Sequence, residues 1–366
     1  MPLPLIVLAV VAIAAPTPDR PRFRDTGLAV GALPTGPVNA ITDVPGVRVG
    51  QVTRIAGDSV RTGVTAILPL PGNVFQDKVP AAFYRANGFG KFAGSPQIEE
   101  LGEIESPIVL TNTLNVAEGI AATVEWTLAQ PGNSEVRSVN AIVGETNDGY
   151  LNDIRGRHVT KADVTAAIAS AAPGPVAEGS VGAGTGTQAF QYKGGIGTSS
   201  RRLPKGWTVG VLVQTNYGGS PAILGVPIPP SPARTADITT AVGGGSIVMV
   251  IATDAPLSDR NLGRLAKRAI VGLSRTGTAM ENGSGDFVVA FSTAAEVRRT
   301  PARRTAVATV ADVPNDGMNG LFVAVADATE EAIYNAMFKA TAVTGNGHRL
   351  DPIDLGRVIP LVKSKR

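Results

Sequence analysis

Short apolar runs alternate along the chain with polar stretches and with stretches rich in Gly and Pro, which predicts a mixture of strands and helices. Val47–Thr53 alternates apolar and polar positions, a pattern typical of a half-buried strand. More continuously apolar strands are predicted at Thr62–Leu70, Pro107–Thr111, Val139–Val143, Thr208–Gln214, Ile247–Ala252, Asp286–Ser292 and Gly320–Ala326. Because these strands do not alternate cleanly, we expect apolar neighbours on both of their faces.

Helical spacing and capping signals lie between these strands. Apolar side chains recur every four residues over 116–128 and define one face of a predicted helix: Val116, Ile120, Val124 and Leu128. Thr160 and Asp163 form a capping-box pattern before an Ala-rich helix that carries Val164 and Ile168. Two more helices are predicted, one capped by Ser258 with Leu262, Leu265, Ala269 and Leu273 inward, and one over Thr329–Thr341 with Ile333, Met337 and Ala340 on one face. No internal repeat is present. The mixture of buried strands and amphipathic helices indicates stacked sheets that are covered by helices.

The N-terminal segment Leu3–Ala15 is almost wholly apolar and is too short to span a bilayer comfortably. Ala12-Ile13-Ala14 resembles a small-residue cleavage signal, although no basic residue precedes the apolar stretch. We therefore predict a signal peptide at 1–15 and a periplasmic or secreted protein without stable membrane insertion. The alternative is a buried apolar N-terminal segment in a cytoplasmic protein.

The composition narrows the chemistry. The 366 residues are 43% hydrophobic and 17% charged, with a net charge of +3, as expected for a compact protein with a large core. Basic clusters at Arg298–Arg304 and at the C-terminal tail are interpreted as solvated surface, and with few aromatic residues nearby no nucleic-acid partner is predicted. The absence of cysteine excludes disulfides and thiolate metal sites, and no HExxH motif is present, so neither a metal nor a cofactor is predicted.

Histidine is almost absent as well. His158 lies in a polar stretch beside Arg155 and Arg157, and His348 lies in the Gly-rich turn that begins at Gly345. Both are interpreted as surface residues. A Ser-His-Asp hydrolase needs a histidine base, so a hydrolase with this sequence must use a different base.

A serine stands where a flexible loop meets a buried strand. The Pro-rich and polar segment 227–242 runs into Gly243-Gly244-Gly245, and Ser246 opens the strand that follows. Glycines permit strained backbone geometry, so a hydroxyl there can attack the preceding carbonyl. Cleavage between Gly245 and Ser246 would expose an α-amine with a pKa of roughly 7.7–8.0, which can act as a general base. Taken alone, the pattern is more often that of an ordinary loop.

The interpretation of Ser246 as a nucleophile does not depend on the Gly-Ser junction alone, because recognisable segments occur in order over most of the chain. They are Pro37–Val49, Leu110–Thr113, Gly144–Asp153, Gly182–Gly186, Lys193–Thr198, Gly210–Asn216, Gly245–Pro256, Gly283–Phe287 and Ala290–Thr293. Together they resemble the self-processing serine aminopeptidases that include L-aminopeptidase/D-Ala-esterase-amidase and the β-peptidyl aminopeptidases. The resemblance implies an α+β fold, a four-layer αββα sandwich like that of N-terminal-nucleophile hydrolases with ornithine acetyltransferase-like topology. It also implies two associated chains, α (16–245) and β (246–366), in homo-oligomers of αβ units.

The resemblance also assigns roles to individual residues. Ser246 matches the nucleophile, and Ser284 and Asp286 match a pair that holds the new α-amine. Asn216 matches an oxyanion-stabilising amide, and Tyr150 matches a tyrosine near the acyl intermediate. Without the resemblance, Ser284 and Asp286 would be interpreted as part of a strand-capping Ser-Gly-Asp turn. Asn216 would be interpreted as a strand-end asparagine, and Tyr150 as a half-buried core residue.

An aminopeptidase must also bind a free ammonium group, for which carboxylates are the natural partners. Glu145 and Asp148 are candidates because they precede Tyr150 in its motif, and Glu135 is a third. The predicted substrates are short peptides or amino-acid amides, preferably with an N-terminal β-amino acid, cleaved through an acyl-enzyme on Ser246. The alternatives are an L-aminopeptidase with D-amino-acid amidase or esterase activity, and an acyltransferase like the ornithine acetyltransferases.

Overall fold

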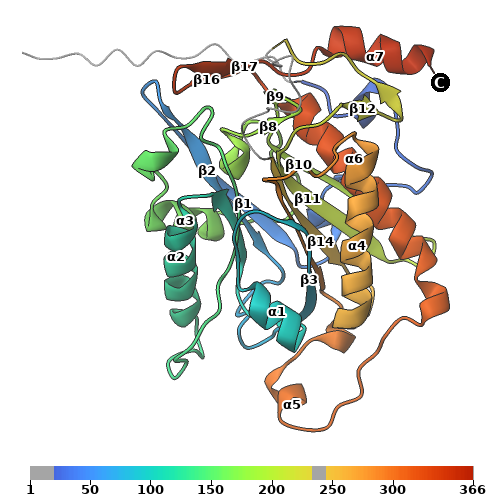
Figure 1. Cartoon of the computed structure of the whole chain (residues 1–366). Coiled ribbons are helices and arrows are strands. Elements are labelled where there is room, and N and C mark those ends of the chain that lie inside the picture. Colours follow the sequence, from blue (N-terminus) through green and yellow to red (C-terminus); the bar gives the residue numbers. More distant parts are fainter. Residues whose placement is uncertain (1–19, 233–244, 366) are drawn as a thin grey trace, which may run out of the picture.

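Two mixed sheets stack face to face between two layers of helices in the computed structural model, which describes residues 20–232 and 245–365 (Figure 1). The first sheet has the order β1 (Arg48–Ala56), β2 (Val60–Leu68), β6 (Ile108–Asn112), β7 (Ile142–Thr146), β4 (Phe92–Ala93). The second has the order β10 (Ile196–Arg202), β11 (Thr208–Asn216), β14 (Ser246–Thr253), β15 (Gly285–Ser292), β3 (Val79–Gly88), β5 (Glu103–Ile104). Within these sheets β6–β7 and β14–β15 are parallel, and the other paired strands are antiparallel.

Helices cover the outer face of each sheet. α2 (Val116–Leu128) and α3 (Lys161–Ala169) cover the first sheet, and α4 (Asp259–Arg275) and α6 (Asn319–Lys339) cover the second (Figure 1). The remaining helices are α1 (Ser95–Leu101), α5 (Pro301–Arg304) and α7 (Leu355–Ser364). Three small ribbons complete the fold: β8 (Gln188–Ala189) with β9 (Tyr192–Lys193), β12 (Ala222–Ile223) with β13 (Val226–Pro227), and β16 (Val343–Gly345) with β17 (His348–Leu350).

The core has three parts, one for each gap between layers. Between the sheets, side chains such as Ile67 and Leu110 meet Val248 and Val250 from β14. The opposite face of β14 packs against α4 and α6 through residues that include Ile247 and Met249. A smaller cluster joins the first sheet to α2 and α3. Because β14 is buried on both faces, its sequence is continuously apolar, and the predicted four-layer αββα sandwich is confirmed.

Local signals placed several elements correctly. The Ser258 side chain accepts a hydrogen bond from the Asn261 N–H at the start of α4, and all four predicted inward residues of that helix are buried. Thr160 and Asp163 form the predicted capping box of α3. The strands predicted at Thr208–Gln214, Ile247–Ala252 and Asp286–Ser292 correspond to β11, β14 and β15.

Three predictions were wrong, two about strands and one about the buried face of a helix. Gly320–Ala326 is not a strand but the first turns of α6, because Leu321, Ala324 and Val325 face the core at helical spacing that continues through Ala328. The strand predicted at Val139–Val143 begins only at Ile142 and ends at Thr146.

The buried face of α2 also differs from the predicted one, since Ile120 and Leu128 are 36% and 39% exposed. A step of four residues overshoots one turn by about 40°, so the predicted stripe drifts off the buried side. The buried face includes Gly119 and Thr123, which give no apolar signal. A Cβ at Gly119 would lie 2.8 Å from Val143 Cγ1, so glycine there lets the helix approach β7 closely.

The N-terminal segment predicted as a signal peptide, 1–15, lies outside the described residues, as do Gly243 and Gly244. None of the helices in the described ranges is both long and apolar enough to cross a bilayer.

Candidate active site

Ser246 is the first residue of β14, the strand near the middle of the second sheet, and only 7% of its surface is exposed. It lies opposite Asn216 of β11 on one side and Gly285 of β15 on the other. Its Oγ donates a hydrogen bond to the Gly245 carbonyl oxygen at 2.7 Å. The Gly285 N–H lies 3.2 Å from that carbonyl oxygen and 3.3 Å from Ser246 Oγ. The hydroxyl is therefore adjacent to a polarised peptide carbonyl, as attack on that peptide would require.

The backbone around this peptide needs glycine. A Cβ at Gly245 would lie 2.5 Å from Tyr217 Cα, and one at Gly285 would lie 2.5 Å from the Phe89 carbonyl oxygen. Both contacts are with atoms that cannot rotate away. The Gly-Ser and Ser-Gly-Asp sequences thus have a packing reason in addition to any chemical one.

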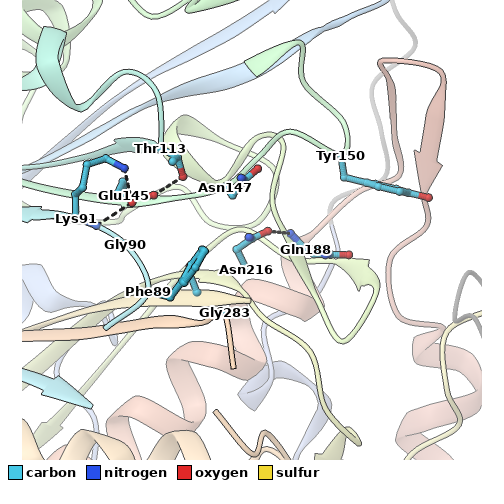
Figure 2. Close-up of a pocket in the computed structure, with 11 residues that line it drawn as sticks. Phe89, Gly90, Lys91, Thr113, Glu145, Asn147, Tyr150, Gln188, Asn216 and Gly283 are labelled. Carbon is cyan, nitrogen blue, oxygen red and sulfur yellow. Dashed lines mark hydrogen bonds and ion pairs between the residues drawn. The ribbon is translucent and has the colours of Figure 1, made fainter. Parts of the chain in front are cut away.

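Asn216 points into the same space as Ser246. Its side chain is 4% exposed, and its Oδ1 accepts a hydrogen bond from the Gln188 N–H at 3.2 Å (Figure 2). This bond fixes the orientation of the amide, so Nδ2 is the atom left to donate. An amide held in this way can stabilise negative charge that develops on an acyl oxygen.

Ser284 and Asp286 form a hydrogen-bonded pair on the other side of the sheet. Ser284 Oγ donates to Asp286 Oδ1 at 2.7 Å, while the buried Asp286 Oδ2 has no partner among the described residues. Burial raises the pKa of Asp286 to about 6, and the nearby negative charge of Glu281 acts in the same direction while the bond from Ser284 opposes it.

The strand register explains where this pair lies. Asp286 is paired with Ile247, not with Ser246, so its side chain points to the α4 and α6 side of the sheet. Neither Ser284 nor Asp286 lines the pocket that contains Ser246. The pair is positioned beside the backbone at the start of β14, which is where a new α-amine would form.

Ser246 is one of the residues that line a pocket of about 330 Å³, whose other lining residues are labelled in Figure 2. The pocket is lined by Phe89, Gly90, Lys91, Thr113, Glu145, Asn147, Tyr150, Gln188, Asn216, Ser246 and Gly283. These residues come from both sheets and from the loops at one end of them, so the pocket exists only once the two sheets have stacked. Its size suits a small substrate such as a short peptide or an amino-acid derivative.

Glu145 is the carboxylate of this pocket. It is the fourth residue of β7 and is 3% exposed. The Thr113 hydroxyl donates to Oε2 in a short hydrogen bond. Oε1 accepts from the Lys91 N–H at 3.0 Å and lies 3.2 Å from Lys91 Nζ (Figure 2). A buried carboxylate that faces a cavity is a suitable partner for an ammonium group.

The other two acidic candidates lie outside the pocket. Asp148 is buried, accepts a hydrogen bond from Asn152 Nδ2 at 3.0 Å, and has its pKa raised to about 6 by burial. It interacts with the buried Lys193, whose pKa is lowered to about 7 by burial despite the opposing charge of Asp148. Glu135 is exposed in the loop after α2. The structure therefore brings together Ser246, Asn216 and Glu145 and separates them from Asp148 and Glu135.

Tyr150 forms the outer wall of the pocket rather than part of the core. It is 42% exposed, and its ring stacks on His348 with a centroid separation of 4.3 Å. In Figure 2 the ring points away from Asn216 and Glu145. His348 is exposed and His158 is hydrogen bonded to Asp153, and neither histidine lines the pocket.

Sequence reasoning missed seven residues that line the pocket: Phe89, Gly90, Lys91, Thr113, Asn147, Gln188 and Gly283. Lys91 and Phe89 lie in a short segment between β3 and β4 that carries no recognisable motif. Asn147 and Thr113 fall within the segments that carry the resemblance, but nothing in the pattern distinguishes them from their neighbours. Gln188 contributes through its backbone N–H, which no sequence pattern reveals.

Comparisons with known proteins agree with this architecture. The model of peptidase family S58 matches residues 39–350. The chain is 40% identical over 393 aligned positions to the beta-peptidyl aminopeptidase BapA of Sphingosinicella microcystinivorans, an alignment that covers 99% of this chain and 97% of that protein. A Burkholderia sp. beta-aminopeptidase structure is 41% identical, with a TM-score of 0.85, over 94% of this chain and 98% of that chain.

A further structure is described as an L-aminopeptidase D-Ala-esterase/amidase from Ochrobactrum anthropi, a prototype serine aminopeptidase with a variant of the Ntn hydrolase fold. It is 37% identical with a TM-score of 0.85 and covers 94% of this chain and 99% of that chain. The fold and these matches define a serine aminopeptidase of Ntn hydrolase type. The chain belongs to peptidase family S58.

Proposed function

We propose that this aminopeptidase processes itself at Gly245–Ser246 and then releases N-terminal residues, preferably β-amino acids, from short peptides and amides through an acyl-enzyme on Ser246. The observation that carries the proposal is the position of Ser246. Its Oγ contacts the carbonyl of the peptide bond that precedes it, at 2.7 Å, and it lines a pocket that also contains Asn216 and Glu145.

Self-cleavage begins with attack of Ser246 Oγ on the Gly245 carbonyl carbon. The Gly285 N–H at 3.2 Å from the carbonyl oxygen supports the developing negative charge. The acyl group moves from nitrogen to oxygen, and water then hydrolyses the ester. The products are an α chain that ends at Gly245 and a β chain of residues 246–366.

The new α-amine of Ser246 supplies the base that histidine does not. Its pKa, roughly 7.7–8.0 in an unperturbed chain, allows it to accept a proton from the serine hydroxyl near neutral pH. Asp286 Oδ2, which has no partner among residues 20–232 and 245–365, is available to hold the ammonium form, and Ser284 orients the carboxylate. Cleavage thus provides a partner for this buried carboxylate oxygen.

Substrate turnover uses the remaining pocket residues. Glu145 binds the substrate ammonium and Asn216 Nδ2 stabilises the oxyanion while Ser246 Oγ takes the acyl group. The leaving amine receives a proton from the α-ammonium, and water releases the amino acid. Tyr150, at the pocket wall, contacts the part of the substrate that lies towards solvent.

The preference for β-amino acids is supported by the relatives named as beta-peptidyl aminopeptidases, at 40% and 39% identity. A second candidate is an L-aminopeptidase with D-amino-acid esterase or amidase activity. It is supported by the Ochrobactrum anthropi structure, at 37% identity.

The first experiment is a denaturing gel with intact-mass analysis of the wild type and of Ser246→Ala. The wild type is expected to show a fragment of about 12 kDa, the share of 121 residues in a 37.5 kDa chain of 366, and Ser246→Ala to show none. A wild type that stays full length under all conditions refutes self-processing. Rates on β-alanyl and L-alanyl p-nitroanilides then distinguish the two substrate classes.

We also propose that the protein is exported and that αβ units assemble into homo-oligomers. Export is supported by the apolar segment 3–15 and its small-residue site at 12–14. Cell fractionation with N-terminal sequencing tests export, and light scattering of the purified enzyme tests assembly. A cytoplasmic protein that retains Met1, or a single αβ unit in solution, contradicts the respective part.

A further inference from the structure

An ion pair stands inside the pocket beside Ser246. Lys91 Nζ lies 3.2 Å from Glu145 Oε1, with the Glu145 side chain 4% exposed and the Lys91 side chain 51% exposed. Among the described residues that line the pocket, Lys91 is the sole cationic side chain and Glu145 the sole carboxylate. The pocket therefore presents one charge of each sign, side by side, to whatever binds there.

The hydrogen bonds of Glu145 fill one of its two carboxylate oxygens. A carboxylate oxygen accepts about two hydrogen bonds. Oε1 already accepts from the backbone N–H and the ammonium of Lys91, whereas Oε2 accepts from Thr113 and keeps one acceptor site. A Cβ at Gly90 would lie 3.1 Å from Oε1, so the backbone also encloses this oxygen. An ammonium group that binds Oε1 consequently competes with the Lys91 side chain, which is the exposed and movable partner.

Competition has different consequences for two kinds of substrate. A substrate with only an ammonium group displaces Lys91 from Glu145 and leaves two positive charges in one small pocket, which is unfavourable. A substrate whose ammonium-bearing carbon also carries a carboxylate gives each charge a partner, because its ammonium takes Glu145 and its carboxylate takes Lys91. The ion pair of the empty pocket is then exchanged for two ion pairs with the substrate.

We propose that Lys91 is a specificity-determining residue that selects N-terminal residues with a zwitterionic head, namely β-aspartyl peptides and amides. This inference rests on the proposed function, because it uses the same ammonium site and the same acyl-enzyme. In a β-aspartyl residue the amine lies two carbons from the scissile carbonyl, as in any β-amino acid, and the carboxylate sits on the amine-bearing carbon. β-Aspartyl compounds are therefore β-amino-acid substrates that also match Lys91.

The reaction is an ordinary hydrolysis. Ser246 Oγ forms an ester with the side-chain carbonyl of the β-aspartyl residue, the amide C–N bond breaks, and the amine leaves with a proton. Water then cleaves the ester, releases aspartate and restores the serine hydroxyl. A γ-glutamyl substrate has the same zwitterionic head but one more methylene before the carbonyl, so it tests the distance between the head and Ser246.

The test compares β-aspartyl and β-alanyl p-nitroanilides on processed wild type and on Lys91→Met. The variant is expected to lower kcat/KM for the β-aspartyl substrate by roughly tenfold or more, the range for a lost charge-assisted hydrogen bond. It is expected to raise kcat/KM for the β-alanyl substrate by up to about fivefold, since the competing ammonium is gone. Lys91→Arg should restore part of the β-aspartyl activity.

Lys161→Met is the matched control. Lys161 is also 51% exposed and also pairs with a glutamate, Glu125, but it lies on α3 outside the pocket. It should leave both rates unchanged. A binding readout comes from product inhibition: free L-aspartate should inhibit the wild type more strongly than β-alanine does, and Lys91→Met should abolish that order.

Two results overturn the inference while the proposed function stands: cleavage of the β-alanyl but not the β-aspartyl substrate, or a Lys91→Met variant that changes both rates in the same proportion. Cleavage of neither substrate, with L-alanyl p-nitroanilide turned over, overturns the β-amino-acid preference and this inference together.

Discussion

Asp286 allows a test of how self-cleavage changes the role of a buried charge. In the uncleaved chain Asp286 is 1% exposed, one of its carboxylate oxygens has no partner within the described part of the chain, and burial raises its pKa from 3.8 to about 6. Ser246→Ala keeps the chain uncleaved, so the perturbation is Asp286→Asn in that background. The substitution removes the buried charge and retains an acceptor for Ser284 Oγ.

The sign and size of the effect of Asp286 on the free energy of unfolding follow from its pKa shift. Between pH 3.8 and 6 the folded state binds more protons than the unfolded state, so this group makes the free energy of unfolding fall as pH rises through that window. A shift of about two units corresponds to about 3 kcal/mol. The new amide N–H₂ meets the same lack of a partner, an opposing effect of about 1–3 kcal/mol that does not depend on pH. The diagnostic quantity is therefore the change with pH.

Urea unfolding at pH 4 and pH 7 measures how the stability difference between Asp286→Asn and its parent changes with pH. The stability of Asp286→Asn relative to its parent should improve by about 2–3 kcal/mol on going from pH 4 to pH 7. Asp58→Asn, which removes an exposed carboxylate, serves as the control and should show little change. A difference between Asp286→Asn and its parent that is the same at both pH values refutes the reasoning. The proposed mechanism pairs Asp286 with the α-ammonium of the processed enzyme, so there the same substitution should lower stability at pH 7 and reduce kcat by about 10²-fold or more.

Three further outcomes are expected. Asn216→Ala should lower kcat on a p-nitroanilide substrate by about 10²–10³-fold with little change in KM, because the proposed role of the amide is to stabilise developing charge; a change confined to KM would contradict this. Glu145→Gln should raise KM about tenfold or more while the 12 kDa fragment still appears on a gel, since the proposed mechanism uses the carboxylate to bind the ammonium and not in processing; loss of the fragment would show otherwise. Arg201→Met should lower the free energy of unfolding, measured in urea, by about 3–5 kcal/mol. Arg201 and Glu331 form a fully buried ion pair at 2.7 Å, and its loss would leave Arg24 as the remaining cation paired with Glu331. An unchanged unfolding midpoint would count against this reasoning.

Much of the fold could be predicted because several elements carry local signals. The caps at Thr160 and Ser258 and the buried strand that begins at Ser246 depend only on nearby residues. The first turns of α6 were mistaken for a strand because the apolar run at 320–326 is short, and a short run does not reveal its period. The buried face of α2 was mistaken because a glycine and a threonine form part of it.

The candidate site could be predicted in part because some of its residues lie in recognisable sequence segments. Ser246, Asn216 and Glu145 lie in segments that resemble known aminopeptidases, and the structure places all three around one pocket. Glu135 and Asp148 are carboxylates of the same kind, but one is exposed in a loop and the other is buried outside the pocket. Sequence position cannot separate them from Glu145, because the separation depends on how the first sheet stacks on the second.

The sequence alone limited the chemical class: without cysteine and with two poorly placed histidines, a hydrolase needs a different base, and the segments that resemble serine aminopeptidases predicted which one. It did so because residue types limit which groups can exchange protons or attack a carbonyl. The tertiary structure decided which carboxylate faces Ser246 and which faces α4 and α6, since one strand register sets the direction of every side chain. It also decided that Lys91 stands beside Glu145, because residues 54 positions apart come together only when β4 pairs with β7 and places Phe92 opposite Gly144.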